Sequence, residues 1–130
     1  TFILYGALGG FVAITAETLF PAPFCAFSFG GGGGLIVFWA VRLLDHFQVD
    51  DVVGAIPVHL FCGVWGTIAA GFTNPEATVL GQLSSVLIII LFVGIMTSMV
   101  WIVLRETMGI RVTAAKEAYG IDKSDFQLNN

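Results

Sequence analysis

Two carboxylates and one histidine stand at the start of an apolar segment, and they are the residues of this chain best suited to chemistry. Asp50 and Asp51 come directly before the segment, and His59 lies inside it. An ionisable side chain at membrane depth is costly, so it is interpreted as a functional group that faces a cavity or a bundle interior. A neutral imidazole donates a hydrogen bond from one ring nitrogen and accepts one at the other. Such a group in an apolar passage suits a small polar solute.

The same residues also have structural interpretations. Carboxylates at the start of a helix complement its partial positive charge, and we favour this capping role for Asp50 and Asp51 over direct ion binding. The alternative for His59 is a structural histidine that bonds a neighbouring helix. Gly63 and Gly66 follow His59 at helical spacing. They predict a helix face that another backbone can approach closely.

The composition is that of a membrane protein. Hydrophobic residues make up 57% of the chain, charged residues 11%, and the mean hydropathy is +0.93, whereas soluble domains carry about 25% charged residues. A net charge of -4 without a basic patch argues against nucleic-acid binding. Cys25 and Cys62 form neither a disulfide framework nor a metal signature. Without a nucleophile–base pair either, we expect no metal, no cofactor and no enzymatic activity.

Four apolar segments predict an all-α, polytopic membrane helix bundle. We expect a transmembrane portion over residues 1–104, with helices at about 2–20, 24–44, 52–72 and 79–104, and a tail over 105–130.

Proline and glycine mark special points within these segments. Pro57 lies inside the third one and predicts a kink and a freed carbonyl beside His59, which favours a cavity there. The five glycines from Gly30 to Gly34 predict a thin part of the second helix, against which neighbours pack closely. A helix break at this point is the alternative. Gly6 and Gly10 form a G-x-x-x-G pair, which predicts a packing face on the first helix.

The basic residues predict the orientation. If the four segments alternate across the bilayer, all five basic residues fall on one side: Arg42, Arg105, Arg111, Lys116 and Lys123. Because cytoplasmic loops carry the excess of Lys and Arg, the 45–51 connector and the tail are expected in the cytoplasm.

The third segment resembles a known family. Val58-His59 and the run from Cys62 to Thr67, after Asp50-Asp51, resemble the penultimate membrane helix of ammonium transporters (the Amt/Rh family). The usual form there is an acidic pair followed by V-H-G-x-x-G-I-W-G-T. Leu60 stands where glycine is commonest, which leaves open a difference in how tightly this helix packs.

The resemblance covers nearly the whole chain in the family's order. Residues 9–16 are similar to the family's G-L-V-A-I-T-A segment, except that Glu17 stands where a glycine commonly follows. Gly109-Ile110-Arg111-Val112 and Gly120-Ile121-Asp122 resemble the family's tail motifs, G-L-R-V and G-L-D.

The resemblance implies a fold, an assembly and site residues. The chain would be the last four transmembrane helices and the cytoplasmic tail of an eleven-helix, inverted-repeat protomer of a homotrimer in the plasma membrane. His59 would be the second of the paired pore histidines, and Thr15 would lie on the pore wall. Ammonium would lose a proton near the constriction and cross as ammonia. A PII-type regulatory protein would be a possible partner at the cytoplasmic face.

Two other functions fit the same residues. The first is an ammonium-sensing membrane domain that signals through the tail. The second is a structural helical subunit of a larger membrane complex.

Overall fold

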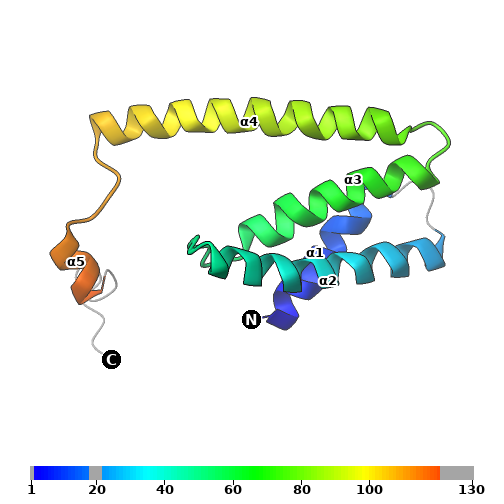
Figure 1. Cartoon of the computed structure of the whole chain (residues 1–130), viewed down its shortest axis with the longest axis horizontal. Helices are drawn as coiled ribbons and strands as arrows, with labels where there is room; N and C mark the ends of the chain where they lie inside the picture. The colour runs from blue at the N-terminus through cyan, green and yellow to red at the C-terminus, as the bar shows by residue number, and fades with distance from the viewer. Residues whose placement is uncertain (1, 18–21, 121–130) are drawn as a thin grey trace. The chain divides into compact units, whose positions relative to one another are not determined.

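The structure is a computed structural model, and it describes residues 2–17 and 22–120, with only the backbone of Glu17. All elements within these ranges are helical, which confirms the predicted fold class (Figure 1). The elements are α1 (Phe2–Ile14), the 3₁₀ turn η1 (Thr15–Glu17), α2 (Pro23–His46), the π-helical turn η2 (Ile56–Phe61), α3 (Cys62–Thr73), α4 (Val79–Thr107) and α5 (Ala114–Tyr119). The chain forms two compact units that divide between Ile89 and Ile90, within α4.

Three helices among the described residues are long and apolar enough to cross a membrane. They are α2, the continuous helix formed by η2 and α3 (Ile56–Thr73), and α4. The helix α1 is apolar but shorter. The end of the first predicted span, residues 18–20, lies outside the described residues.

The glycine run lies in the middle of α2, and the helix continues through it. This confirms the predicted thin helix and excludes the predicted alternative, a helix break. Glycine costs about 1 kcal/mol relative to alanine in a helix interior. In lipid, however, every backbone polar group needs an internal partner, and the helix supplies one for each residue.

The first unit is held together by close backbone contacts between α1 and α2. A Cβ built on Gly33 would lie 2.7 Å from the Gly9 carbonyl oxygen and 2.8 Å from Ala13 Cβ. A Cβ on Gly10 would lie 3.1 Å from the Gly30 carbonyl oxygen. In contrast, a Cβ on Gly6 would meet nothing within 4 Å. The tight contact therefore belongs to the middle of α1.

The other face of α1 packs against α3 and η2. A Cβ on Gly66 would collide with the Ala13 backbone. A small core lies where α1, α2, η2 and α3 meet, and it consists of Ala13, Val37, Val58 and Cys62, each at most 2% exposed. Because these side chains are small, the helix axes approach closely.

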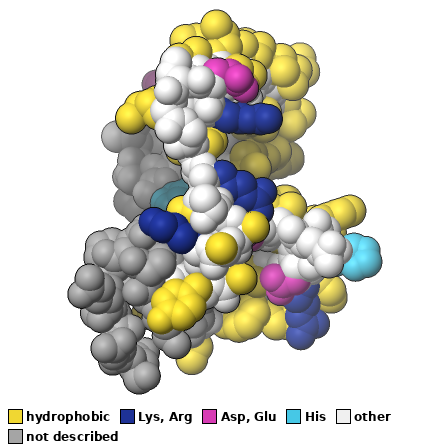
Figure 2. Space-filling view, turned by 90° about the vertical axis from the view of Figure 1, so that its left-hand side faces the viewer, with side chains coloured by type: hydrophobic (Ala, Val, Ile, Leu, Met, Phe, Trp, Pro, Cys, Tyr) yellow, Lys and Arg dark blue, Asp and Glu magenta, His cyan; other side chains and the backbone are white. Residues whose placement is uncertain are grey.

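The long helix α4 presents apolar side chains all round. None of its 29 residues is buried, although its membrane-span window has a hydropathy of 2.8. At about 1.5 Å per residue it is ~43 Å long, which exceeds the ~30 Å bilayer core. Hydrophobic side chains predominate over the visible surface in Figure 2. A surface of this kind requires lipid or other helices around it.

The second unit ends in a short, capped helix. Thr113 Oγ1 accepts a hydrogen bond from the Lys116 amide at 3.4 Å at the start of α5. Arg111 donates to both carboxylate oxygens of Glu117, at 3.2 and 3.3 Å. Gly109 has a φ of +70° and turns the chain between α4 and α5. The second tail motif extends past Gly120 and lies largely outside the described residues.

The glycine contact can be tested with two alanine substitutions in one helix of the full-length protein. Gly33→Ala is expected to lower the free energy of unfolding by about 1–3 kcal/mol, because its Cβ has no room against α1. Gly31→Ala is the control, because a Cβ there would meet nothing within 4 Å, and alanine favours a helix. Thermal unfolding midpoints in detergent would measure both. A Gly33→Ala midpoint at or above that of Gly31→Ala would contradict this packing.

Candidate functional site

The segment before His59 is a tight turn followed by an irregular helix. Val52 and Val53 form a turn, and Gly54 has a φ of +69°, a conformation that L side chains rarely adopt. The helix then begins with η2 at Ile56, four residues after the Val52 expected from the sequence. Val52 and Val53 are apolar, so the sequence predicted that they belong to the helix. The positive φ of Gly54 instead places them in a turn.

All the amide donors at the start of this helix are accounted for. Asp51 accepts from the Ala55 amide through Oδ1 at 2.9 Å and from the Ile56 amide through Oδ2 at 2.7 Å. Pro57 has no N–H to satisfy, and the Val58 amide donates to the Gly54 carbonyl at 3.1 Å. Helix starts normally leave such amides without intrahelical partners. One carboxylate and one proline therefore complete this helix start.

The two carboxylates of the acidic pair differ in their environments. Asp51 is half-buried and makes both capping bonds. Asp50 is exposed, and its side chain makes no hydrogen bond or ion pair with the described part of the chain. The capping bonds thus come from Asp51 alone.

The sequence predicted that Pro57 kinks the interior of a helix, and this prediction was wrong. Pro57 lies in the first turn of η2 and is buried, and proline is tolerated in a first turn because no intrahelical bond is lost there. The irregularity beside His59 is the π-helical turn from Ile56 to Phe61. Single π-helical turns within helices are frequent at functional sites.

His59 lies on the unpacked side of η2. Val58 is 2% exposed and Cys62 0% exposed, whereas His59 and Leu60 are exposed. The imidazole makes no hydrogen bond with any described residue. Within the described residues, the ring therefore does not link α1, α2 and α3, and neither ring nitrogen has a hydrogen-bond partner there.

The two glycines after His59 lie in different surroundings. Gly66 is buried against Ala13. Gly63 is half-buried, and a Cβ there would meet nothing within 4 Å. Because residues four apart share a helix face, Gly63 leaves open space one turn after His59.

Cys62 and Trp65 attach α3 to the glycine run of α2. The Cys62 thiol donates to the Gly33 carbonyl, with sulfur and oxygen 3.3 Å apart. The Trp65 indole N–H donates to the Phe29 carbonyl at 3.2 Å, and a Cβ on Gly32 would lie 3.1 Å from Trp65 Nε1. Trp65 is thus a packed tryptophan in this unit.

Thr15 lies at the other end of the α1–α3 contact. It is exposed, and its hydroxyl donates to the Val12 carbonyl at 2.7 Å. The turn η1 that contains Thr15 contacts α3. No hydrogen bond joins Thr15 to His59 in the described structure.

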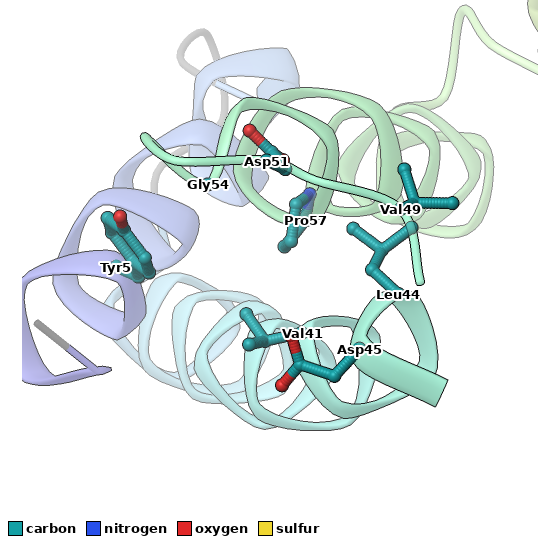
Figure 3. A pocket seen from close by; sticks show the side chains of 8 residues that line it. All are labelled: Tyr5, Val41, Leu44, Asp45, Val49, Asp51, Gly54 and Pro57. Atoms are coloured by element: carbon teal, nitrogen blue, oxygen red, sulfur yellow. The ribbon is translucent and has the colours of Figure 1, made fainter. Parts of the chain in front are cut away.

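Tyr5 and Gly54 were not singled out from the sequence, and they lie beside a small cavity. The Tyr5 hydroxyl donates to the Val52 carbonyl at 2.8 Å, across 47 positions of the chain. The cavity has a volume of about 40 Å³, and Figure 3 shows Tyr5 and Gly54 among the residues that line it. A glycine just after two valines could have indicated the turn, but nothing in the sequence pairs Tyr5 with it.

Comparisons with known proteins agree with one another. The model of the Ammonium Transporter Family matches residues 1–130. A Synechocystis sp. protein named for ammonium transport is 36% identical over 121 residues, 92% of this chain and 27% of that protein. The ammonium transporter Amt2 of Archaeoglobus fulgidus is 31% identical over 90% of this chain and 29% of its own length. The ammonium transporter of Bacillus subtilis is 29% identical over 90% of this chain and 33% of its own length. The chain thus spans about a quarter to a third of the length of these relatives.

The capping by Asp51 predicts unequal effects of two aspartate substitutions in the full-length protein. Asp51→Ala is expected to lower the free energy of unfolding by about 1–2 kcal/mol, because the amides of Ala55 and Ile56 lose their acceptors. Asp50→Ala is the matched control and is expected to change it by less than about 0.5 kcal/mol. Thermal unfolding midpoints would measure the difference. Equal losses for the two variants would show that the pair acts together in some other way.

Proposed function

The chain belongs to the Ammonium Transporter Family, and from this we propose that it is a helical portion of a membrane protein that conducts ammonium as ammonia past His59. The observation that carries the proposal is the imidazole of His59. It lies within a membrane-span candidate, it is exposed in this unit, and no described residue binds it.

The energetics favour a neutral solute at this depth. A bare cation in the middle of a bilayer is costly, whereas a neutral amine needs only hydrogen-bond partners. A neutral imidazole offers one donor and one acceptor. Ammonium that leaves its proton near the constriction would therefore cross as ammonia, bonded to the ring of His59. The proton would move separately or along the paired histidines.

The surroundings of His59 support a passage on its side of the helix. The packed side of this helix carries the core residues Val58, in η2, and Cys62, at the start of α3. On the side of His59, Gly63 has no side chain to fill the space one turn later. We propose that other helices of the full-length protein enclose this space and leave a narrow passage. Thr15 would lie on the wall of the same passage.

The assembly follows from the family pattern. We propose that the chain supplies the last four transmembrane helices, within residues 1–104, and the cytoplasmic tail, residues 105–130, of an eleven-helix, inverted-repeat protomer. Transporters with inverted repeats place their sites near the bilayer midplane, where the repeats meet. The protomer would form a homotrimer in the plasma membrane, and a PII-type protein is a proposed partner at its cytoplasmic face. The exposed apolar surface of α4 suits lipid or such neighbouring helices.

His59→Ala in the full-length protein tests the proposed function. We expect a change of at least about fivefold in methylammonium uptake or in the preference for ammonium over potassium, because the intramembrane hydrogen-bond partner is lost. His46→Ala is the control, because this exposed histidine belongs to the end of α2. Uptake and currents would be measured in proteoliposomes at equal protein content. Wild-type uptake and selectivity in His59→Ala would refute the role of His59.

The proposed orientation can be tested with single cysteines. Ala118→Cys, in α5, is expected to react with a membrane-impermeant maleimide only in inside-out vesicles, because the distribution of basic residues predicts a cytoplasmic tail. Glu76→Cys, in the turn before α4, is expected to react only from the outside of intact cells. Both residues are exposed, so labelling reports the side of the membrane. Labelling of Ala118→Cys in intact cells would reverse the assignment.

A further inference from the structure

Tyr5 connects α1 to the turn that begins the His59 helix. Its hydroxyl donates to the Val52 carbonyl at 2.8 Å. Its ring lies against Gly54, where an added Cβ would be 2.9 Å from Tyr5 Cε2 (Figure 3). One side chain therefore holds this turn by a hydrogen bond and by packing.

The turn and the π-helical segment form one hydrogen-bonded unit. The Gly54 amide donates to the Asp51 carbonyl at 3.2 Å, and the Val58 amide donates to the Gly54 carbonyl at 3.1 Å. The carboxylate of Asp51 meanwhile binds the amides of Ala55 and Ile56. Any rotation of the turn is thus transmitted through these bonds to the residue next to His59.

A second attachment lies on the other side of His59. The Cys62 thiol donates to the Gly33 carbonyl, and Cys62 is fully buried against Gly9 and Gly33. His59 lies between this attachment and the Tyr5 contact, yet its own ring has no partner among the described residues. The backbone on either side therefore sets the Cα–Cβ direction of His59, the vector from which the imidazole extends.

The π-helical turn makes this backbone sensitive to its upstream attachment. A π-helical turn carries an i→i+5 pattern and is rare because the α-helix competes with it. With Cys62 fixed, a turn that relaxed toward α-helical geometry would have to rotate the residues before it. We propose that Tyr5 is a positioning residue for transport, which holds residues 51–54 and thereby keeps η2 in the geometry that aims His59 into the passage. This inference rests on the proposed function of His59.

Tyr5→Phe in the full-length protein tests the proposal, because it removes the hydroxyl and keeps the ring against Gly54. We expect methylammonium uptake, or the preference for ammonium over potassium, to fall about threefold to tenfold, the usual consequence of one lost hydrogen bond. The thermal unfolding midpoint should stay within about 3 °C of wild type, because only one hydrogen bond is lost and the ring keeps its packing. Tyr119→Phe is the matched control, because Tyr119 is 68% exposed in α5 and its hydroxyl makes no hydrogen bond with a described residue.

A double-mutant cycle separates positioning from general destabilisation. If Tyr5 acts through His59, Tyr5→Phe should add less than about twofold to the effect of His59→Ala. If Tyr5→Phe lowered transport by the same factor in the His59→Ala background as in wild type, the proposal would be overturned. Wild-type transport by Tyr5→Phe would also overturn it.

Solid-state NMR of the histidine side chains gives a readout that does not depend on transport. Tyr5→Phe is expected to shift the imidazole resonances of His59 and to leave those of His46 unchanged, with Tyr119→Phe changing neither. Unshifted His59 resonances would overturn the proposal even if transport fell. If His59→Ala transports like wild type while Tyr5→Phe still shifts the His59 resonances, the proposed function fails and the structural coupling stands.

Discussion

The first unit depends on the close approach of helix backbones at a few small residues. Between apolar helices in lipid there is no hydrophobic driving force, so van der Waals contact and interhelical hydrogen bonds hold them together. Gly9 and Gly33 bring α1 onto α2, and Gly66 brings α3 onto the end of α1 at Ala13. The Cys62 thiol and the Trp65 indole then bind carbonyls of α2. Carbonyls are accessible to these donors because the glycine run carries no side chains to cover them.

This packing gives the third membrane helix two different sides. Pro57, Val58 and Cys62 face the neighbouring helices and are buried. His59 and Leu60 are exposed, and the space above Gly63 is open. The imidazole of His59 makes no hydrogen bond with the described residues of α1, α2 or α3. The exposed side of this helix, with His59 on it, is the side that the proposed function uses.

Both local hydrogen bonds and a contact from another helix stabilise the start of the helix that contains His59. Asp51, Pro57 and the Gly54 carbonyl account for the amide groups from Ala55 to Val58. The turn itself is held from outside by Tyr5. The π-helical turn at His59 thus follows a helix start that has both a local cap at Asp51 and a contact from another helix through Tyr5.

The sequence by itself determined the class of fold and the family, because both rest on local properties. Apolar length predicts membrane helices, and the residues around His59 and Cys62 carry the family pattern within one segment. The glycine run was likewise interpreted correctly as a helix, because lipid leaves its backbone no other way to satisfy its polar groups.

Tertiary structure decided the details that depend on distant residues. Gly66 lies in a helix contact and Gly63 beside open space, although both follow His59 at helical spacing, because only one of them faces Ala13. Val52 lies in a turn and not in a helix, because Gly54 takes a positive φ and the Tyr5 hydroxyl binds the Val52 carbonyl from 47 positions away. Periodicity and composition report the local preferences of a segment. They do not identify which distant residues contact that segment in the folded chain.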